Sequence, residues 1–547
     1  MELTLAQPPD EVPSPPRPRR WRAIGVADVA FGVLVVVAVL AYLSRTRGYV
    51  FSSDDWVYAQ RGHSLVDYFR PYNLSLNVVP IAVYRVLLGL FGFGRTLPLR
   101  MLAASTEAAV AVALYLVVRA RIAPAAALVV GVSILWYPNE VLYPSTWNFF
   151  AALAATVLAA ALVVRRRPAE DLLLAVAVAF ALMTAPTGVA GAAGCLAYLA
   201  LRRERRGRRW LAVALPATAW AVWWLTVAHT PRDAAQRSLA QSRQLVVDGV
   251  IRSFDGLVAD NRVLGGVLMA LFAAYLVVTI VGGIRANRRR GWRALVDGLG
   301  AADHQLAWSA ALVGWWVGLA FSRGFVASAT VMRYQLAGSV FVVLAWLPSL
   351  RPARLAERLH RAAPTAIALA LSAAVIAANN AGIADQARPL TTDSNRLRAN
   401  MVEANLGPSV VPDWRRIGLG PGDNPSLPSS LYRTLVARYG VPTGTTPTHP
   451  DAAVLALLAT RLDPDAGGAV DRCLALTSPV TIAGGRAVRL RAPERPVTVR
   501  LRRFEPGWTT LGRIPAGRTV VIRLPAGPAP RGWMVAADGA CRAVPGP

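Results

Sequence analysis

Residues 24–43 read IGVADVAFGVLVVVAVLAYL, and this apolar stretch decides the class of fold. A helix of about 20 apolar residues is long enough to cross the ~30 Å hydrocarbon core of a bilayer. Ten similar runs follow, at residues 98–118, 123–137, 146–164, 170–184, 187–201, 210–229, 262–284, 305–321, 334–349 and 363–380. The pattern predicts an α-helical polytopic membrane protein with about 11 spanning helices.

The composition agrees with a membrane-embedded chain. Hydrophobic residues make up 54% of it and charged residues only 16%, whereas a soluble domain is about a quarter charged. A net charge of +28 would also fit a nucleic-acid-binding protein. However, the basic residues are all arginines and lie in short clusters between the apolar runs, where they meet anionic headgroups. We therefore expect membrane lipids as partners, and no nucleic acid.

The arginine clusters also predict the orientation. The segment 202–209 reads RRERRGRR, and residues 165–167 are three arginines, whereas the alternate turns at 138–145 and 185–187 contain none. Positively charged loops stay in the cytoplasm. We therefore predict a multi-pass protein of the plasma (inner) membrane. Its N-terminus would be cytoplasmic, with residues 1–23 a disordered leader.

Residues 78–93, VVPIAVYRVLLGLFGF, are apolar enough to be taken for a further span. If they crossed, every later arginine cluster would face outward. Arg85 would also lie within the bilayer, where a charge costs about 2.5–3.5 kcal/mol. The segment is therefore expected to be a helix lying in the outer interface, within a first outer loop at 44–97.

After the transmembrane domain, 24–381, the chain changes character. Residues 382–547 are expected to form an extracytoplasmic α+β domain, with a helix near 429–439 and a β-sandwich from about 470. Short alternating segments such as VTVRLRRF and TVVIRL, separated by glycine and proline, are typical of such a sandwich. Cys473 and Cys541 flank it, and an oxidising compartment would favour a disulfide between them.

The first outer loop contains two adjacent carboxylates, Asp54 and Asp55, within FSSDDWVY at 51–58. Such a pair could supply a general base or hold a divalent cation such as Mg²⁺, Mn²⁺ or Ca²⁺. The following Trp56 and Tyr58 are candidates for contacts to an acceptor or a sugar. The alternative is a solvated acidic loop beside an interfacial aromatic belt.

Two further outer connections carry candidate residues. Arg323 and Arg333 lie in SRGFVASATVMR at 322–333, against the charge bias of the other outer turns, and Tyr334 follows. Arginine binds phosphate through paired hydrogen bonds, although these two could instead reach lipid headgroups. In the turn at 136–143, Glu140 would be another outer acid. Tyr143 there could stack on a sugar or simply anchor a helix end.

These features together resemble the GT-C superfamily of integral membrane glycosyltransferases, which includes protein O-mannosyltransferases and aminoarabinose transferases. SSDDWVYA resembles the acidic motif of the family's first outer loop. The stretch from LNVVPIAVYRVLLGLFGFGRTLPLR onward resembles its interfacial helix and next span, and WYPNEVLYPSTW resembles its second outer acidic loop. The resemblance covers roughly residues 24–380.

The resemblance implies a polyprenyl-phosphate sugar as donor and a cell-envelope glycan, lipid or protein as acceptor. Asp54 or Asp55 would be the base, and Arg323 or Arg333 would neutralise the leaving phosphate; a metal ion would be helpful but not obligatory. Two other functions fit the sequence. One is a lipid or solute transporter, or flippase, and the other is a non-catalytic envelope protein that binds glycan.

Overall fold

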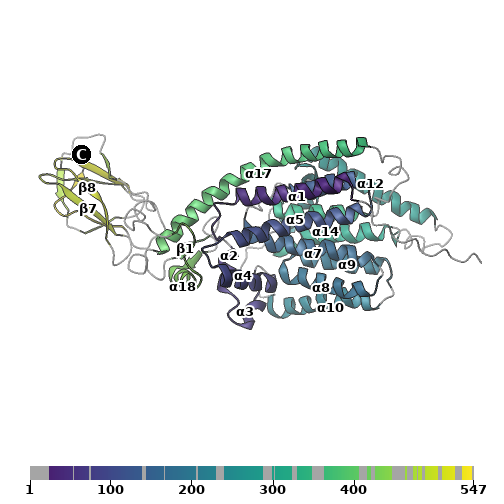
Figure 1. The fold of residues 1–547 in the computed structure, drawn as a ribbon. Coiled ribbons are helices and arrows are strands. Elements are labelled where there is room, and N and C mark those ends of the chain that lie inside the picture. The colour runs from purple at the N-terminus through teal and green to yellow at the C-terminus, as the bar shows by residue number, and fades with distance from the viewer. Residues whose placement is uncertain are drawn as a thin grey trace, which may run out of the picture.

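The computed structural model shows a bundle of long helices with a small β-sandwich beyond one end (Figure 1). It describes residues 24–52, 54–72, 75–137, 143–165, 167–204, 207–228, 239–286, 299–300, 302–322, 329, 331–347, 362–405, 416–419, 426–445, 462–464, 472–476, 479–482, 487–502, 508–523 and 533–544. The predicted leader, 1–23, lies outside the described residues.

Each of the predicted apolar runs falls on a helix. These helices are α1 (Val26–Arg45), α5 (Leu97–Arg119), α6 (Pro124–Leu135), α7 (Trp147–Val164), α8 (Ala169–Thr184), α9 (Thr187–Leu201), α10 (Gly207–Trp223), α12 (Arg262–Ala286), α14 (Asp303–Ser322), α15 (Met332–Trp346) and α17 (Ala362–Asn405). Within the described ranges, 6 helices are long and apolar enough to cross a membrane. The protein is therefore membrane-associated and helical, whereas the count of 11 spans stays a prediction.

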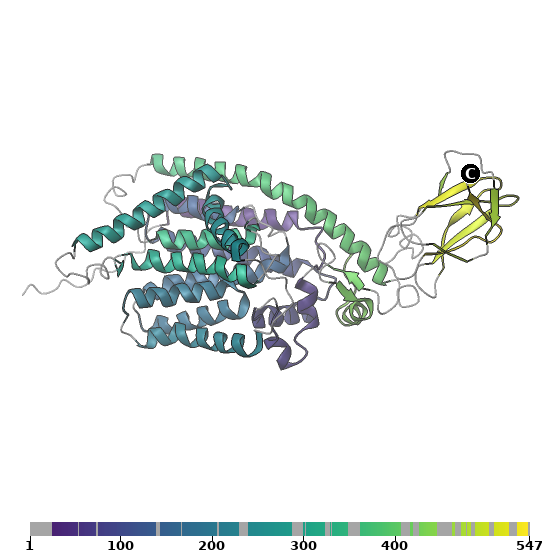
Figure 2. The same ribbon diagram turned by 180° about the vertical axis from the view of Figure 1, so that it is seen from behind.

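Most of the long helices lie side by side along a common direction (Figure 2). Helix α7 packs against α5, α8 and α9, and α14 packs against α9 and α15. Small residues allow close approach: a side chain at Gly191 would meet Thr156 on α7, and one at Gly194 would meet Trp308 on α14.

Helix α11 (Leu239–Asp255) was not predicted from the sequence. It packs against α12, α14 and α15, and its Gly249 lies directly on the ring of Trp316. Polar residues are interspersed along the helix, and its buried face includes Ser242 and Ser253 beside Leu245 and Phe254, so it has no long apolar run. A search for spanning runs overlooks such an amphipathic helix.

Three short helices gather at one end of the bundle, which we call the α2–α4 end (Figure 1). They are α2 (Asp54–Gln60), α3 (Leu65–Phe69) and α4 (Val78–Phe91). The helix predicted at 78–93 is therefore confirmed. It packs on α2, α3 and α8, while Val86 and Leu90 stay exposed. Its place in the bilayer interface stays a prediction.

Helix α17 is a single helix of 44 residues that runs along the bundle and past the α2–α4 end (Figure 1). The domain boundary predicted at 381/382 falls inside it, so the change of composition there is not a break in structure. Beyond it lie strands β1 (Arg416–Gly418) and β2 (Ser426–Pro428) and helix α18 (Ser429–Tyr439), which confirms the helix predicted at 429–439.

The C-terminal strands form two antiparallel sheets that share one apolar core. One sheet has the order β3-β9-β6-β11-β4 and the other β5-β10-β7-β8. The strands are β3 (Leu462–Pro464), β4 (Arg472–Ala475), β5 (Val480–Ile482), β6 (Ala487–Arg491), β7 (Val497–Arg502), β8 (Thr509–Ile514), β9 (Thr519–Arg523), β10 (Trp533–Ala536) and β11 (Cys541–Val544). Leu490 and Ile522 from the first sheet and Val499 and Val535 from the second are fully buried. This is the predicted sandwich.

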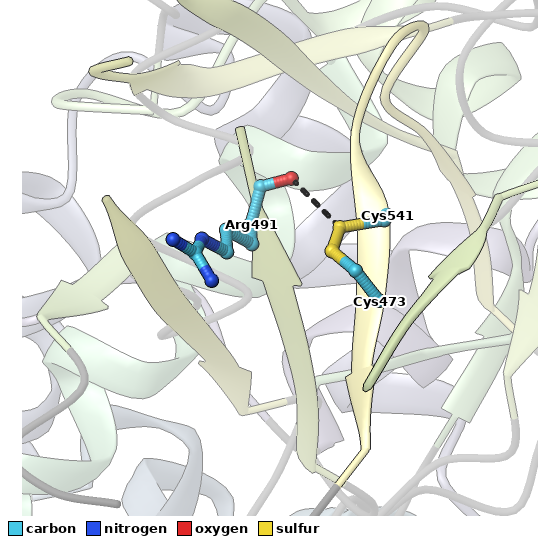
Figure 3. Close-up of a disulfide and its surroundings, with 3 residues drawn as sticks. All are labelled: Cys473, Arg491 and Cys541. Atoms are coloured by element: carbon cyan, nitrogen blue, oxygen red, sulfur yellow. Dashed lines mark hydrogen bonds between the residues drawn. A yellow bond between two sulfur atoms is a disulfide. The ribbon is translucent and has the colours of Figure 1, made fainter. Parts of the chain in front are cut away.

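A disulfide joins Cys473 on β4 to Cys541 on β11, as predicted, with the two Cα atoms 5.3 Å apart (Figure 3). The strands are antiparallel neighbours, and Cys473 lies opposite Ala543 in their register. The sulfur of Cys541 also lies 3.7 Å from the carbonyl oxygen of Arg491 on the neighbouring strand β6.

Candidate functional site

Asp55 is completely buried at the start of α2. Its carboxylate accepts a hydrogen bond from the backbone N–H of Ser52 at 2.8 Å and from the hydroxyl groups of Tyr49 and Tyr84. Burial is the largest influence and raises the pKa of Asp55 to about 7, although these hydrogen bonds oppose it. Tyr84 belongs to α4, so Asp55 fastens α2 to that helix.

Asp54 differs from its neighbour in exposure. Its side chain is only partly buried, and its Oδ1 accepts a hydrogen bond of 2.5 Å from the hydroxyl of Tyr72. Tyr72 lies in the short turn before α4, where its backbone pairs with that of Ser75. The two adjacent aspartates therefore have different environments, and Asp54 is the one that a molecule outside the protein can reach.

Trp56 and Tyr58, predicted to contact an acceptor or a sugar, belong to the core of the first loop. Both are almost fully buried. The indole N–H of Trp56 donates to the carbonyl of Phe51 at 2.9 Å, and Tyr58 donates to the amide oxygen of Asn77 at 3.3 Å. Both rings are buried in this structure, so their contact with an acceptor or a sugar stays a prediction.

Arg333 and Tyr334 start α15, and the guanidinium of Arg333 lies 5.0 Å from the ring of Tyr334. Tyr334 is buried with its ring centre 6.3 Å from that of Phe149 on α7. The preceding residue, Asn148, donates to the hydroxyl of Tyr58 at 3.1 Å. The first turn of α7 therefore connects the aspartate loop to Arg333, which places both at one end of the bundle. Arg323 lies outside the described residues.

Glu140 also lies outside the described residues. Tyr143 is described, but its hydroxyl donates to the carboxylate of Asp393 at 2.8 Å. Asp393 belongs to the part of α17 that runs past the α2–α4 end, where Arg398 donates to the carbonyl of Gly48 at 2.6 Å. Sequence reasoning missed both α17 residues because it placed them in a separate domain.

Helix α18 packs against the segment that carries Asp54 and Asp55. The rings of Trp56 and Tyr432 lie 5.2 Å apart, and the backbone N–H of Phe93 donates to the carbonyl of Tyr439 at 2.8 Å. Gly92 makes this approach possible, since its φ is +61° and a side chain there would lie 2.3 Å from the same carbonyl. The C-terminal region therefore contributes to the structure around the site.

A divalent cation at Asp54 or Asp55 stays a prediction. Among the residues that the structure describes, no group of three or more histidine, cysteine, aspartate or glutamate side chains could hold a metal ion. Both oxygens of the buried Asp55 accept hydrogen bonds, whereas Asp54 is only partly buried.

Glu107 is a functional candidate that the sequence analysis missed. It lies in the middle of α5 and lines a cavity together with Tyr42, Arg45 and Tyr137. A lone glutamate inside the apolar run at 98–118 was the available signal, because ionisable residues within spanning helices are rare and usually functional.

The fold and the site together define a membrane-associated helical protein with a carboxylate-bearing loop at one end and a disulfide-linked sandwich. No protein-family model, curated protein or solved structure matches the chain.

Proposed function

We propose that the protein is a membrane glycosyltransferase that moves a sugar from a polyprenyl-phosphate donor to a cell-envelope acceptor, with Asp54 as general base. One observation carries the proposal. Asp54 is partly exposed and oriented by Tyr72, whereas Asp55 is fully buried and engaged by Tyr49, Tyr84 and the backbone. The same end of the bundle also presents Arg333.

The reaction is a displacement at the anomeric carbon. The acceptor hydroxyl oxygen forms a bond to that carbon while the bond from the carbon to the phosphate oxygen breaks, through an oxocarbenium-like transition state. The acceptor proton passes to the carboxylate of Asp54. The leaving polyprenyl phosphate keeps the electron pair, and the guanidinium of Arg333 offsets the charge that develops on it.

The orientation belongs to the same proposal. With the arginine clusters in the cytoplasm, the α2–α4 end faces outward and meets donors that have been carried across the bilayer. The sandwich then lies on the same side, in an oxidising compartment that suits its disulfide.

The test is transfer activity of the purified full-length protein with a panel of polyprenyl-phosphate sugars and envelope acceptors. Asp54→Asn should lose about 10²–10⁴-fold in rate, the range expected when a general base is removed. Arg333→Gln should also lose activity, while the control Arg416→Gln, on β1, should keep it. Full activity in Asp54→Asn would exclude Asp54 as the base. Failure of the wild type to turn over any lipid-linked donor would count against the function itself.

A transporter is the second candidate, because Glu107 is an ionisable group in the middle of a spanning helix. Proteoliposomes separate the two functions. A transporter would move a fluorescent lipid or solute across the bilayer without any acceptor, and a glycosyltransferase would form product only when an acceptor is added.

A further inference from the structure

A cavity of about 40 Å³ lies between helices α1, α5, α6 and α17. Glu107 of α5 lines it, with Tyr42 and Arg45 of α1 and Trp136 and Tyr137 at the end of α6. This volume holds roughly two or three water-sized groups. The groups that donate hydrogen bonds to Asp55, which belong to Tyr49, Ser52 and Tyr84, do not line it.

Glu107 lies at the midpoint of its helix. It is the eleventh residue of the 23 in α5, so it lies about 15 Å from the Leu97 end at a rise of 1.5 Å per residue. Within the part of the chain that the structure describes, no group donates a hydrogen bond to its carboxylate or forms an ion pair with it. A charge in the middle of a spanning helix is costly and normally has a partner.

The other acid in a spanning helix of this region is paired. Asp28 of α1 accepts hydrogen bonds from Tyr115 and Arg119, each at 2.6 Å, and from the backbone of Gly25 at 2.8 Å. The carboxylate of Asp28 therefore has partners within the bundle, in contrast to that of Glu107. Arg45 also lines the cavity, but in the described structure its Nη2 donates to Asn380 of α17 at 3.0 Å and it forms no ion pair with Glu107.

The other residues that line the cavity indicate which kind of ligand could pair with Glu107. Tyr42, Trp136 and Tyr137 line the same cavity as Glu107. A carboxylate among aromatic faces is the arrangement that recognises an organic cation, since both the charge and the ring quadrupoles attract it. The small volume favours a primary ammonium group, which can donate hydrogen bonds to the carboxylate, over a bulkier quaternary one.

We propose that this cavity binds a primary ammonium group, with Glu107 as its counter-ion. Such a group can arrive on the headgroup of phosphatidylethanolamine or on a free amine. If a lipid supplies it, Arg45 at the edge of the cavity is available to contact the lipid phosphate. The proposal does not depend on glycosyl transfer.

The experiment uses full-length protein in nanodiscs of phosphatidylglycerol, which has no amine. Phosphatidylethanolamine is added to the lipid in one arm and ethanolamine to the buffer in the other, and the thermal unfolding midpoint is followed in both. In one arm, the unfolding midpoint of the wild type should rise and saturate, which gives an apparent affinity for the amine. Glu107→Gln should weaken this apparent affinity at least tenfold. The control Glu170→Gln, whose carboxylate pairs with Arg165 at the start of α8, should respond as the wild type does.

The arms identify the source. A lipid ligand predicts that Arg45→Gln weakens the response to phosphatidylethanolamine, and a free amine predicts that Arg45→Gln leaves the response to ethanolamine unchanged. Glu107→Gln should unfold no earlier than the wild type in amine-free nanodiscs, because it removes an unpaired charge from the middle of the helix. The proposal fails if Glu107→Gln responds like the wild type, if neither arm saturates, or if phosphatidylcholine replaces phosphatidylethanolamine equally well.

Discussion

The hydroxyl of Tyr72 donates a 2.5 Å hydrogen bond to Oδ1 of Asp54, which joins the turn before α4 to the first residue of α2. This contact holds a partly exposed carboxylate in one orientation. It distinguishes Asp54 from Asp55, whose partners bury it completely.

Replacement of Tyr72 by phenylalanine tests whether this contact positions the proposed base. A hydrogen bond to a charged group contributes about 1.5–3 kcal/mol, so kcat should fall about tenfold to a hundredfold while KM changes little. The control is Tyr68→Phe on α3, which should leave both constants unchanged. A rise in KM with unchanged kcat would contradict the positioning role and indicate loss of substrate binding.

Asp55 should make stability depend on pH. Burial raises its pKa to about 7 from the ordinary value of 3.8, so the folded protein keeps a proton that the unfolded chain releases. Its contribution to stability is therefore present below about pH 4, declines as pH rises toward 7 and then levels off, with a slope of at most about 1.4 kcal/mol per pH unit.

Asp55→Asn removes this titration. As the pH rises from 4.5 to 7.5, the unfolding temperature of the wild type should fall relative to that of Asp55→Asn. Thermal unfolding in detergent at several pH values measures this difference. If the unfolding temperatures of the two proteins changed in parallel with pH, the pKa of Asp55 would be the same in the folded and the unfolded state.

Gly92 should be intolerant of a side chain. A methyl group there would meet the carbonyl oxygen of Tyr439 at 2.3 Å, and φ is +61°. Gly92→Ala should therefore separate α18 from α4 and lower stability by about 1–3 kcal/mol. Gly89→Ala, in the last turn of α4, meets no neighbour and should be neutral or slightly stabilising. Thermal unfolding and limited proteolysis near α18 compare the two, and equal behaviour would rule out the close contact.

Reduction of the Cys473–Cys541 disulfide should destabilise the sandwich. The bond closes a loop of 68 residues, for which the chain-entropy estimate is about 4 kcal/mol. The double variant Cys473→Ala/Cys541→Ala should unfold at lower temperature, and reductant should no longer affect it. The control Cys195→Ala, which removes the buried free thiol on α9, should keep its sensitivity to reductant. Insensitivity of the wild type to reductant would mean that the bond adds no stability.

The sequence by itself determined the apolar helices, the membrane class and the strands of the sandwich. These follow from local patterns: an apolar run such as 24–43 favours a helix that can lie in lipid, and alternation such as that at 497–502 favours a strand with one buried face. The sequence also located the aspartate pair in the connection between two apolar helices, α1 and α5, because two carboxylates interrupt the apolar pattern there.

Only the tertiary structure decided what each of these residues does. Trp56 and Asp55 look as accessible in the sequence as Asp54, but contacts from α4 and α18 bury them. The amphipathic α11, the continuation of α17 through residue 381 and the unpaired Glu107 beside Tyr42 depend on packing between segments far apart in the chain. Burial is set by all neighbours in space, whereas a sequence pattern reports only those along the chain.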